Sequence, residues 1–175
     1  KVTLKNESKV EKRKGIDQAN LVFAYHVSLA NDKKNFAAQV LTILIAGGMS
    51  SRLFQEIREK RNLAYSVRGD FDINKDFAYN IIYVGTTKEN IEKVKKLILE
   101  EFKDIAKNLT EEEFKQIKEQ IIGNYYISME DSQTQMVNLL DHEVNGNAED
   151  FYEFEKNISE VKLEDVKNLA KIKNY

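Results

Sequence analysis

The chain has 175 residues, a formal net charge of −2 at pH 7, and neither cysteine nor proline. A net charge so close to zero gives no electrostatic basis for nucleic-acid binding, because proteins that bind nucleic acid usually carry a strong basic surplus. The lack of cysteine excludes disulfides, iron–sulfur clusters and thiolate zinc sites, and it suits the reducing cytoplasm, where we expect the protein to lie.

The length fits one domain, which we place at residues 1–175. No linker rich in proline, glycine or serine divides the sequence. The longest apolar run, residues 36–49, is interrupted by Gln39 and Thr42 and is shorter than the roughly 20 residues that span a bilayer. Residues 1–20 are polar and charged, unlike a signal peptide. We therefore expect no membrane partner.

The first half of the chain alternates between strand and helix patterns. Leu21, Phe23 and Tyr25 begin a period-two series that predicts a strand over residues 21–29, followed by a polar turn. Residues 36–46 are apolar on nearly all sides, which predicts a buried helix that ends at Gly47 and Gly48. Ser50 or Ser51 is suited to cap the next helix, over residues 52–61.

A hairpin and a helical C-terminal part follow. Residues 63–71 and 77–83 read as strands joined by a polar turn at 72–76. Two Thr-x-x-Glu capping boxes, Thr86–Glu89 and Thr110–Glu113, predict the starts of two long amphipathic helices. Further helices are expected at 133–145, 149–156 and 163–172.

This order of elements predicts an α+β fold. The simplest arrangement is an antiparallel sheet with helices packed on one face, a split β-α-β core and a helical C-terminal part.

The residues by themselves give little sign of independent catalysis. His26 and His142 are the only histidines, and neither belongs to the two-histidine, one-glutamate helical motif of zinc peptidases. No G-x-S-x-G elbow or phosphate-binding loop occurs, and Ser50 and Ser51 are better read as helix caps. We therefore expect no catalytic residue, no metal ligand and no cofactor bound by this chain.

Arg58 and Tyr65 form the one pair that suggests binding. They lie seven residues apart, where a helix runs into a strand, so both side chains could reach one cleft and donate hydrogen bonds to a carbonyl or an oxyanion. Strand periodicity alone offers a different interpretation, because Tyr65 shares its phase with Leu63 and Val67 and would then belong to the core.

The stretch that contains this pair, "GGMSSRLFQEIREKRNLAYSV" (residues 47–67), closely resembles a segment of the M16 zinc metallopeptidases, the group of mitochondrial processing peptidase, pitrilysin and insulin-degrading enzyme. The stretches "QANLVFAYHVSL", "DFAYNIIYVGTTKENIEKV" and "GNYYISMEDSQTQMVNLLDHEVNG" extend the resemblance over residues 16–173. It implies the half-domain fold of the LuxS and processing-peptidase metallohydrolases.

In that family, homologous half-domains close over the substrate like a clam shell, and the catalytic half carries an H-x-x-E-H zinc motif. The present sequence lacks this motif and is similar to the non-catalytic C-terminal half. The resemblance implies that the zinc belongs to a homologous partner half, that the substrate is a peptide, and that Arg58 and Tyr65 bind it. It gives no role to Arg52, Arg61 or Arg68, which we interpret as surface or helix-end charges.

The resemblance also admits a non-enzymatic scaffold, like the core subunits of respiratory complexes that resemble processing peptidases. A self-standing peptide-binding module is a third alternative. The resemblance leaves open whether the half-domains share one polypeptide and whether the chain forms a homo-oligomer. Every alternative implies an exposed apolar patch on the isolated chain.

Overall fold

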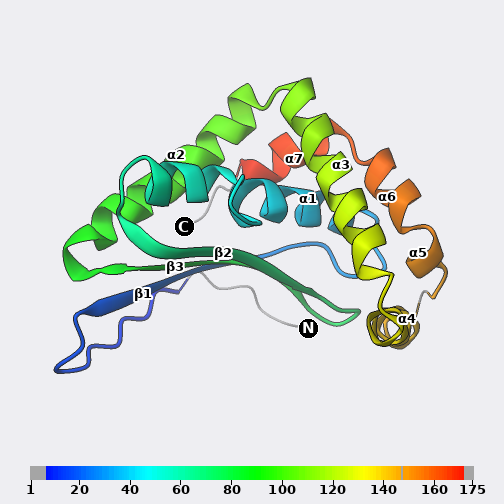
Figure 1. Cartoon of the computed structure of the whole chain (residues 1–175), viewed down its shortest axis with the longest axis horizontal. Helices are drawn as coiled ribbons and strands as arrows, with labels where there is room; N and C mark the ends of the chain where they lie inside the picture. Colours follow the sequence, from blue (N-terminus) through cyan, green and yellow to red (C-terminus); the bar gives the residue numbers. More distant parts are fainter. Residues whose placement is uncertain (1–6, 147, 172–175) are drawn as a thin grey trace.

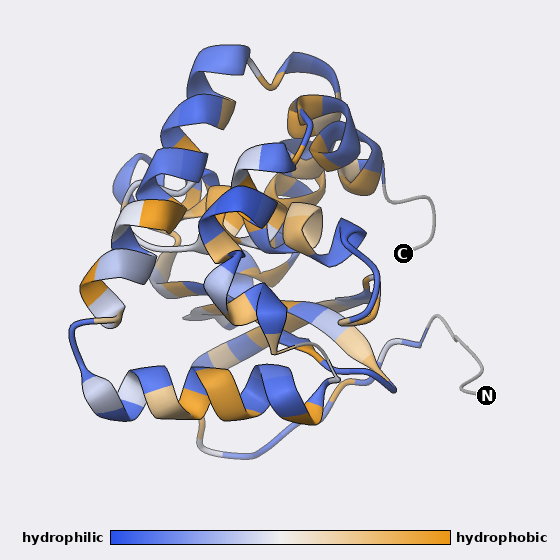
Figure 2. Ribbon diagram, turned by 90° about the vertical axis from the view of Figure 1, so that its right-hand side faces the viewer, coloured by the Kyte–Doolittle hydropathy of each residue, from blue (hydrophilic) through white to orange (hydrophobic). Residues whose placement is uncertain are grey.

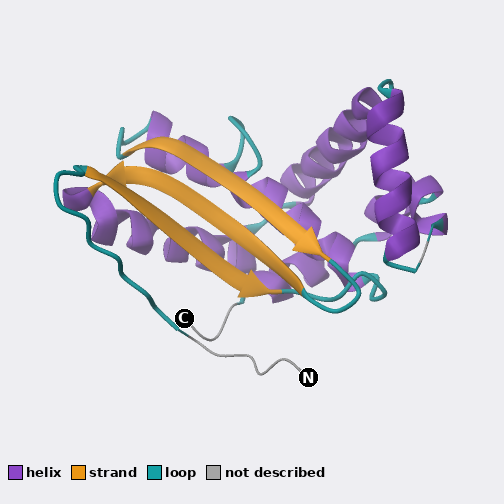
Figure 3. Cartoon of the chain, turned by 90° about the horizontal axis from the view of Figure 1, so that it is seen from below, coloured by secondary structure: helices purple, strands orange, loops and turns teal. Residues whose placement is uncertain are grey.

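A computed structural model describes residues 7–146 and 148–171. Three strands form one antiparallel sheet in the order β1-β3-β2, with bounds Gln18–His26 for β1, Ala64–Ile73 for β2 and Ala78–Thr87 for β3. Helices α1, α2 and α7 lie on the same side of the sheet (Figure 1), and α3 leads from them away beyond its end (Figure 3). Because β3 pairs with both neighbours, β1 and β2 run parallel on either side of it, which confirms the predicted α+β fold with a split β-α-β core.

The helices follow in chain order with short connections. Their bounds are Lys34–Ala46 (α1), Phe54–Glu59 (η1, a π-helix), Lys88–Asn90 (η2, a 3₁₀ turn), Ile91–Asn108 (α2), Glu111–Ser128 (α3), Ser132–Val144 (α4), Glu149–Tyr152 (α5), Phe154–Glu160 (α6) and Leu163–Ala170 (α7). The expected helix over 149–156 is thus divided at Glu153, and the predicted end of the last helix at Ile172 lies outside the described residues.

The core lies between α1 and the sheet. The apolar run that predicted a buried helix forms α1, in which Val40, Leu41 and Ile45 are fully buried. From β3, alternate side chains enter the same core, including Ile82 and Val84. Their partners across the sheet are Phe23 and Leu21 in β1 and Gly69 and Val67 in β2. Burial of this apolar surface is the main force that holds helix to sheet.

The opposite face of the sheet has no helix over it in the described residues (Figure 3). Side chains on this open face include Val22 from β1, Tyr83 from β3 and Arg68 from β2, which lie opposite one another in register. They are exposed or half-buried. The fold therefore leaves one surface of the sheet free to contact another molecule.

Only one of the two predicted capping boxes begins a helix. Thr110 caps α3 as expected, since its hydroxyl accepts the backbone N–H of Glu113 at 3.2 Å. The helix start predicted at Thr86 is wrong. Strand β3 continues through Thr86, whose buried hydroxyl donates to the carbonyl of Leu63 at 2.5 Å, and α2 starts only at Ile91.

Helix α4 lies crosswise beside the hairpin end of the sheet (Figures 1 and 2). None of its residues is buried. Its exposed side chains include Met136, Val137, Leu140 and Val144, which follow a helical spacing and form a surface apolar stripe. This stripe is an exposed apolar patch of the kind that the sequence led us to expect. Within the described residues, no helix combines the length and the apolar character that crossing a membrane requires.

Candidate functional site

The site is built from the connection between α1 and β2. Two glycines reverse the chain after α1. A Cβ at Gly47 would stand 2.7 Å from the carbonyl oxygen of Ile43, and Gly48 has a φ of 117°, which L-residues rarely adopt. The predicted serine cap does not form, because the hydroxyl of Ser51 donates to the Gly48 carbonyl at 2.6 Å and so stabilises the turn.

The π-helix η1 then presents Arg58 to solvent. Phe54 and Ile57 are buried, whereas Arg58 is exposed and its guanidinium carbon lies 4.9 Å above the centre of the Phe54 ring. Asn62, with a φ of 49°, ends the helix and turns the chain into β2. Single π-turns of this kind are frequent at functional sites.

A β-bulge determines the position of Tyr65. Ala64 pairs with Thr86 and Ser66 pairs with Gly85, so Tyr65 is an extra residue with no partner on β3. The bulge shifts the phase of the strand: Val67 is buried in the core, whereas Tyr65 is 47% exposed on the open face. The interpretation of Tyr65 as a core residue, which assumed unbroken alternation, is therefore wrong.

The ring of Tyr65 lies against Gly85 on the neighbouring strand. A Cβ at Gly85 would stand 2.5 Å from Cζ of Tyr65, so only glycine leaves room for the ring there. Partial desolvation and the nearby Tyr83 phenol raise the pKa of Tyr65 above its ordinary value. A tyrosine hydroxyl is protonated at neutral pH even without this shift, so that of Tyr65 can donate a hydrogen bond.

Arg58 and Tyr65 line the same open hollow, of about 620 Å³. Its other lining residues are Gly48, Met49, Phe54, Ser66, Val67, Arg68 and Tyr83. The hydroxyl of Tyr83 donates to the side-chain oxygen of Asn20 at 2.7 Å, which fixes this wall against β1. The hollow thus combines two guanidiniums and the Tyr65 hydroxyl, which can donate hydrogen bonds, with the apolar side chains of its lining.

Sequence reasoning gave Arg68 no role, but it also faces the hollow. Its register partner is Tyr83, which lines the same wall. Side chains alternate between the two faces along β2 after the bulge. This alternation would have placed Arg68 on the same face as Tyr65, but only a reader who knew of the bulge could have applied it.

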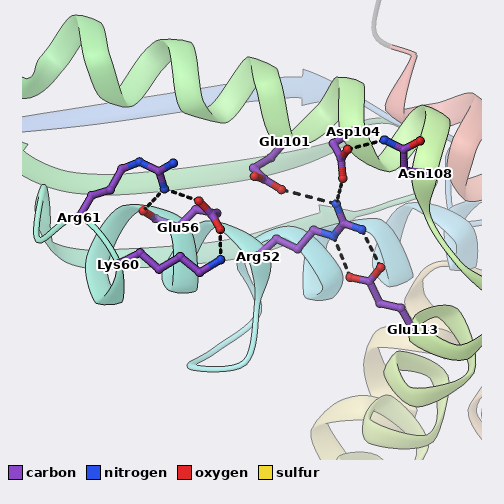
Figure 4. A network of polar contacts seen from close by, with 8 residues as sticks. All are labelled: Arg52, Glu56, Lys60, Arg61, Glu101, Asp104, Asn108 and Glu113. Atoms are coloured by element: carbon purple, nitrogen blue, oxygen red, sulfur yellow. Dashed lines mark hydrogen bonds and ion pairs between the residues drawn. The ribbon is translucent and has the colours of Figure 1, made fainter.

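The interpretation of Arg52 as a surface charge is wrong, although it does stand at the start of a helix, as a helix-end charge would. Its side chain is only 17% exposed, and it donates to both carboxylate oxygens of Glu113, at 2.7 and 2.6 Å, and to Asp104 at 2.5 Å (Figure 4). Glu101 lies 3.6 Å away. These bonds, that to Glu113 above all, raise the pKa of Arg52, while burial raises the pKa of Glu101. Arg52 therefore ties the start of η1 to α2 and α3.

Arg61 matches its interpretation as a helix-end charge. It and Lys60 both bind the carboxylate of Glu56 (Figure 4), and hydrogen bonds from these two cations lower the pKa of Glu56. This cluster is exposed to solvent at Lys60 and Arg61 and does not line the hollow.

The residues present do not fit a zinc ion. Residues 7–146 and 148–171 contain no group of three or more histidine, aspartate or glutamate side chains arranged to hold a metal. His26 lies on the open face opposite Tyr79, and the ring of His142 lies 6.2 Å from that of Phe151. The two histidines thus stand on separate elements without a shared ligand set.

Comparison with known protein families shows to which family the chain belongs. Residues 1–121 match the family model described as the peptidase M16 inactive domain. The chain belongs to the M16 peptidase family. Within that family it corresponds to the inactive domain, which agrees with the sequence resemblance in residues 47–67.

Relatives and solved structures agree with this assignment. A protein of Rickettsia bellii named an uncharacterized zinc protease is 33% identical over 118 residues, which is 67% of this chain and 29% of the relative. The chain thus spans about a third of the length of its curated relatives.

Three solved structures share the fold. A peptidase M16 inactive domain from Pseudomonas fluorescens is 26% identical, with a TM-score of 0.75 and coverage of 90% of this chain and 38% of that one. A Helicobacter pylori protease has a TM-score of 0.82 at 20% identity (91% and 39% covered). A chain of complex III from Candida albicans has a TM-score of 0.76 at 18% identity (90% and 40% covered).

Proposed function

We propose that this chain is the zinc-less half of an M16-type zinc metallopeptidase. In this proposal a homologous partner half, on the same or a separate polypeptide, carries the zinc and the hydrolytic centre. This chain closes over the peptide substrate, and it is inactive alone because it has no metal site of its own among the described residues. Two features support a partner: the open face of the sheet and the exposed apolar stripe on α4.

The observation that carries the proposal is the shared hollow of Arg58 and Tyr65. The Arg58 guanidinium, held over Phe54, and the Tyr65 hydroxyl can both donate hydrogen bonds. Aimed at a substrate carbonyl, they would hold the peptide and stabilise negative charge on its oxygen as the bond is attacked. Closure of the two halves would exclude water and strengthen these contacts.

The proposal is tested by kinetics of the assembled enzyme. Arg58→Ala and Tyr65→Phe should each lower kcat/KM by about 10- to 10³-fold, the scale of losing one oxyanion donor. Arg61→Ala is the matched control, because Arg61 is paired with Glu56 outside the hollow and should leave kcat/KM within about twofold. Wild-type kinetics in both hollow variants, with folding intact, would refute the assignment of these residues.

The alternative is a non-enzymatic scaffold, for which the similar fold of a complex III chain is the supporting observation. A scaffold has no need of donors in an open hollow, so the retained pair of Arg58 and Tyr65 favours the peptidase.

A further inference from the structure

The five arginines of the chain divide into two groups by their partners. Arg13 pairs with Glu11, Arg52 with three carboxylates, and Arg61 with Glu56. In the described part of the chain, no carboxylate lies within ion-pair distance of Arg58 or Arg68. These two unpaired arginines line the same hollow.

The lack of a partner for Arg68 is not explained by a shortage of carboxylates nearby. Asp70 is two residues further along β2 and so lies on the same face, yet its carboxylate accepts the backbone N–H of Phe71 at 2.8 Å. The chain has 29 acidic residues against 27 basic ones. Two guanidiniums facing one hollow therefore create a local positive potential on a chain whose net charge is negative.

We propose that Arg68, in the same hollow as the Arg58 that contacts the substrate carbonyl, forms a subsite for a carboxylate of the bound peptide. The planar fork of a guanidinium matches the two oxygens of a carboxylate, so Arg68 can bind it through paired hydrogen bonds, and the charge of Arg58 adds to the attraction. The apolar groups of Met49 and Phe54 in the same lining would contact the methylene groups that carry the carboxylate. This inference rests on the proposed function, in which the hollow receives peptide, and it adds a preference for acidic substrates.

A peptide offers such a carboxylate from two sources, an Asp or Glu side chain or its own C-terminus. Both present the same planar anion, so the chemistry of the subsite is common to them. Three peptides of equal length and otherwise identical sequence separate the sources. The first has a central Glu and blocked ends, the second a central Gln and blocked ends, and the third a central Gln and a free C-terminal carboxylate.

The experiment is a titration of the ¹⁵N-labelled 175-residue chain with each peptide, followed by NMR chemical shifts. We expect the Glu peptide, the free-carboxylate peptide or both to bind about three- to tenfold more tightly than the blocked Gln peptide, with shifts at Gly48, Ser66 and Tyr83. The tighter source identifies the natural carboxylate. Arg68→Gln should reduce the preference to less than about twofold, and added salt should weaken it.

Arg61→Gln is the matched control, since this arginine is neutralised by Glu56 and stands outside the hollow, so the preference should persist. Equal binding of all three peptides at the hollow would overturn the carboxylate subsite but leave the proposed peptide-binding role standing. No shift at the hollow with any peptide would overturn both. A preference that survives Arg68→Gln would also overturn the subsite.

Discussion

At the scale of single residues, the site depends on a glycine that has no functional group. Gly85 provides the space in which the ring of Tyr65 rests, and the bulge in β2 turns that ring to the open face. The position of the phenol is thus set by two backbone features and not by the rotamer of Tyr65 alone.

Gly85→Ala should therefore impair function while sparing stability. The added methyl group collides with an exposed, movable ring, so the chain should fold with a free energy of unfolding within about 1 kcal/mol of wild type. The displaced ring should lower kcat/KM of the assembled enzyme about 10-fold or more, as in Tyr65→Phe. Denaturant unfolding and steady-state kinetics check the two halves of this prediction.

Gly69→Ala is the matched control on β2. Its Cβ would stand 2.9 Å from Cβ of Ala46 and 3.0 Å from the carbonyl oxygen of Thr42, within the packed contact between α1 and the sheet. Neither neighbour is the end of a flexible chain, so this variant should lose about 1–3 kcal/mol of stability. Unchanged kinetics in Gly85→Ala would contradict the account of Tyr65.

The sequence allowed the chemistry of the site to be predicted but not its geometry. Arg58 and Tyr65 could be singled out from their types and spacing, yet nothing in the residues around Tyr65 signals a bulge, because an extra residue leaves the local composition unchanged. Likewise the identity of Arg52 does not reveal its three carboxylate partners, which come from helices about 50 or more residues away.

At the scale of elements, Arg52 connects the start of η1 to α2 and α3. Arg52→Gln removes the charge that compensates Glu101, Asp104 and Glu113. Glu101 is the most buried of the three, and leaving it uncompensated should lower the free energy of unfolding by about 1–3 kcal/mol at pH 7. Arg61→Gln should cost less than about 1 kcal/mol, because its ion pair is more exposed. Denaturant midpoints of the two variants test the contrast, and equal losses would contradict it.

The effect of Arg52 should also depend on pH. Hydrogen bonds from Asn108 and Arg52 hold the pKa of Asp104 below its ordinary value of 3.8. A lowered pKa contributes stability that is complete above the unfolded value and is lost as the pH falls through the folded value. Burial raises the pKa of Glu101, and removal of Arg52 should raise it further, so this carboxylate takes up its proton first as the pH falls. The stability difference between wild type and Arg52→Gln should thus shrink steadily on acidification, first through Glu101 and then, below about pH 4, through Asp104. A difference that grew on acidification would be inconsistent with this ion pair.

The two capping boxes illustrate how far motifs predict element boundaries. Thr110 and Thr86 occur in the same four-residue pattern, but only Thr110 is followed directly by a helix. Thr86 is buried between strands, where its hydroxyl donates a hydrogen bond to the Leu63 carbonyl. This long-range contact overrides the local preference of the capping-box sequence for a helix start. The apolar run of α1 was predictable because its pattern and its burial have the same cause.

At the scale of the whole molecule, the order of elements was sufficient to predict the layers. The chain runs from a strand through a helix into a hairpin. With one apolar face on each of these elements, the simplest packing places helices on one face of an antiparallel sheet. Helices on one face imply an open opposite face, and no helix covers that face in the part of the chain that the structure describes. What the order could not indicate is that the open face would border the hollow. The proposal of a half-enzyme follows from this one-sided architecture together with membership of the M16 inactive-domain family.

The most direct test of that proposal is peptidase activity on a quenched, unstructured peptide. It should be measured for this chain with zinc, for the candidate zinc-bearing half, and for the two mixed. The account predicts cleavage by the mixture well above either half alone, abolished by a chelator. Cleavage by this chain alone would contradict it, and a stable complex that cleaves nothing would contradict it in favour of the scaffold.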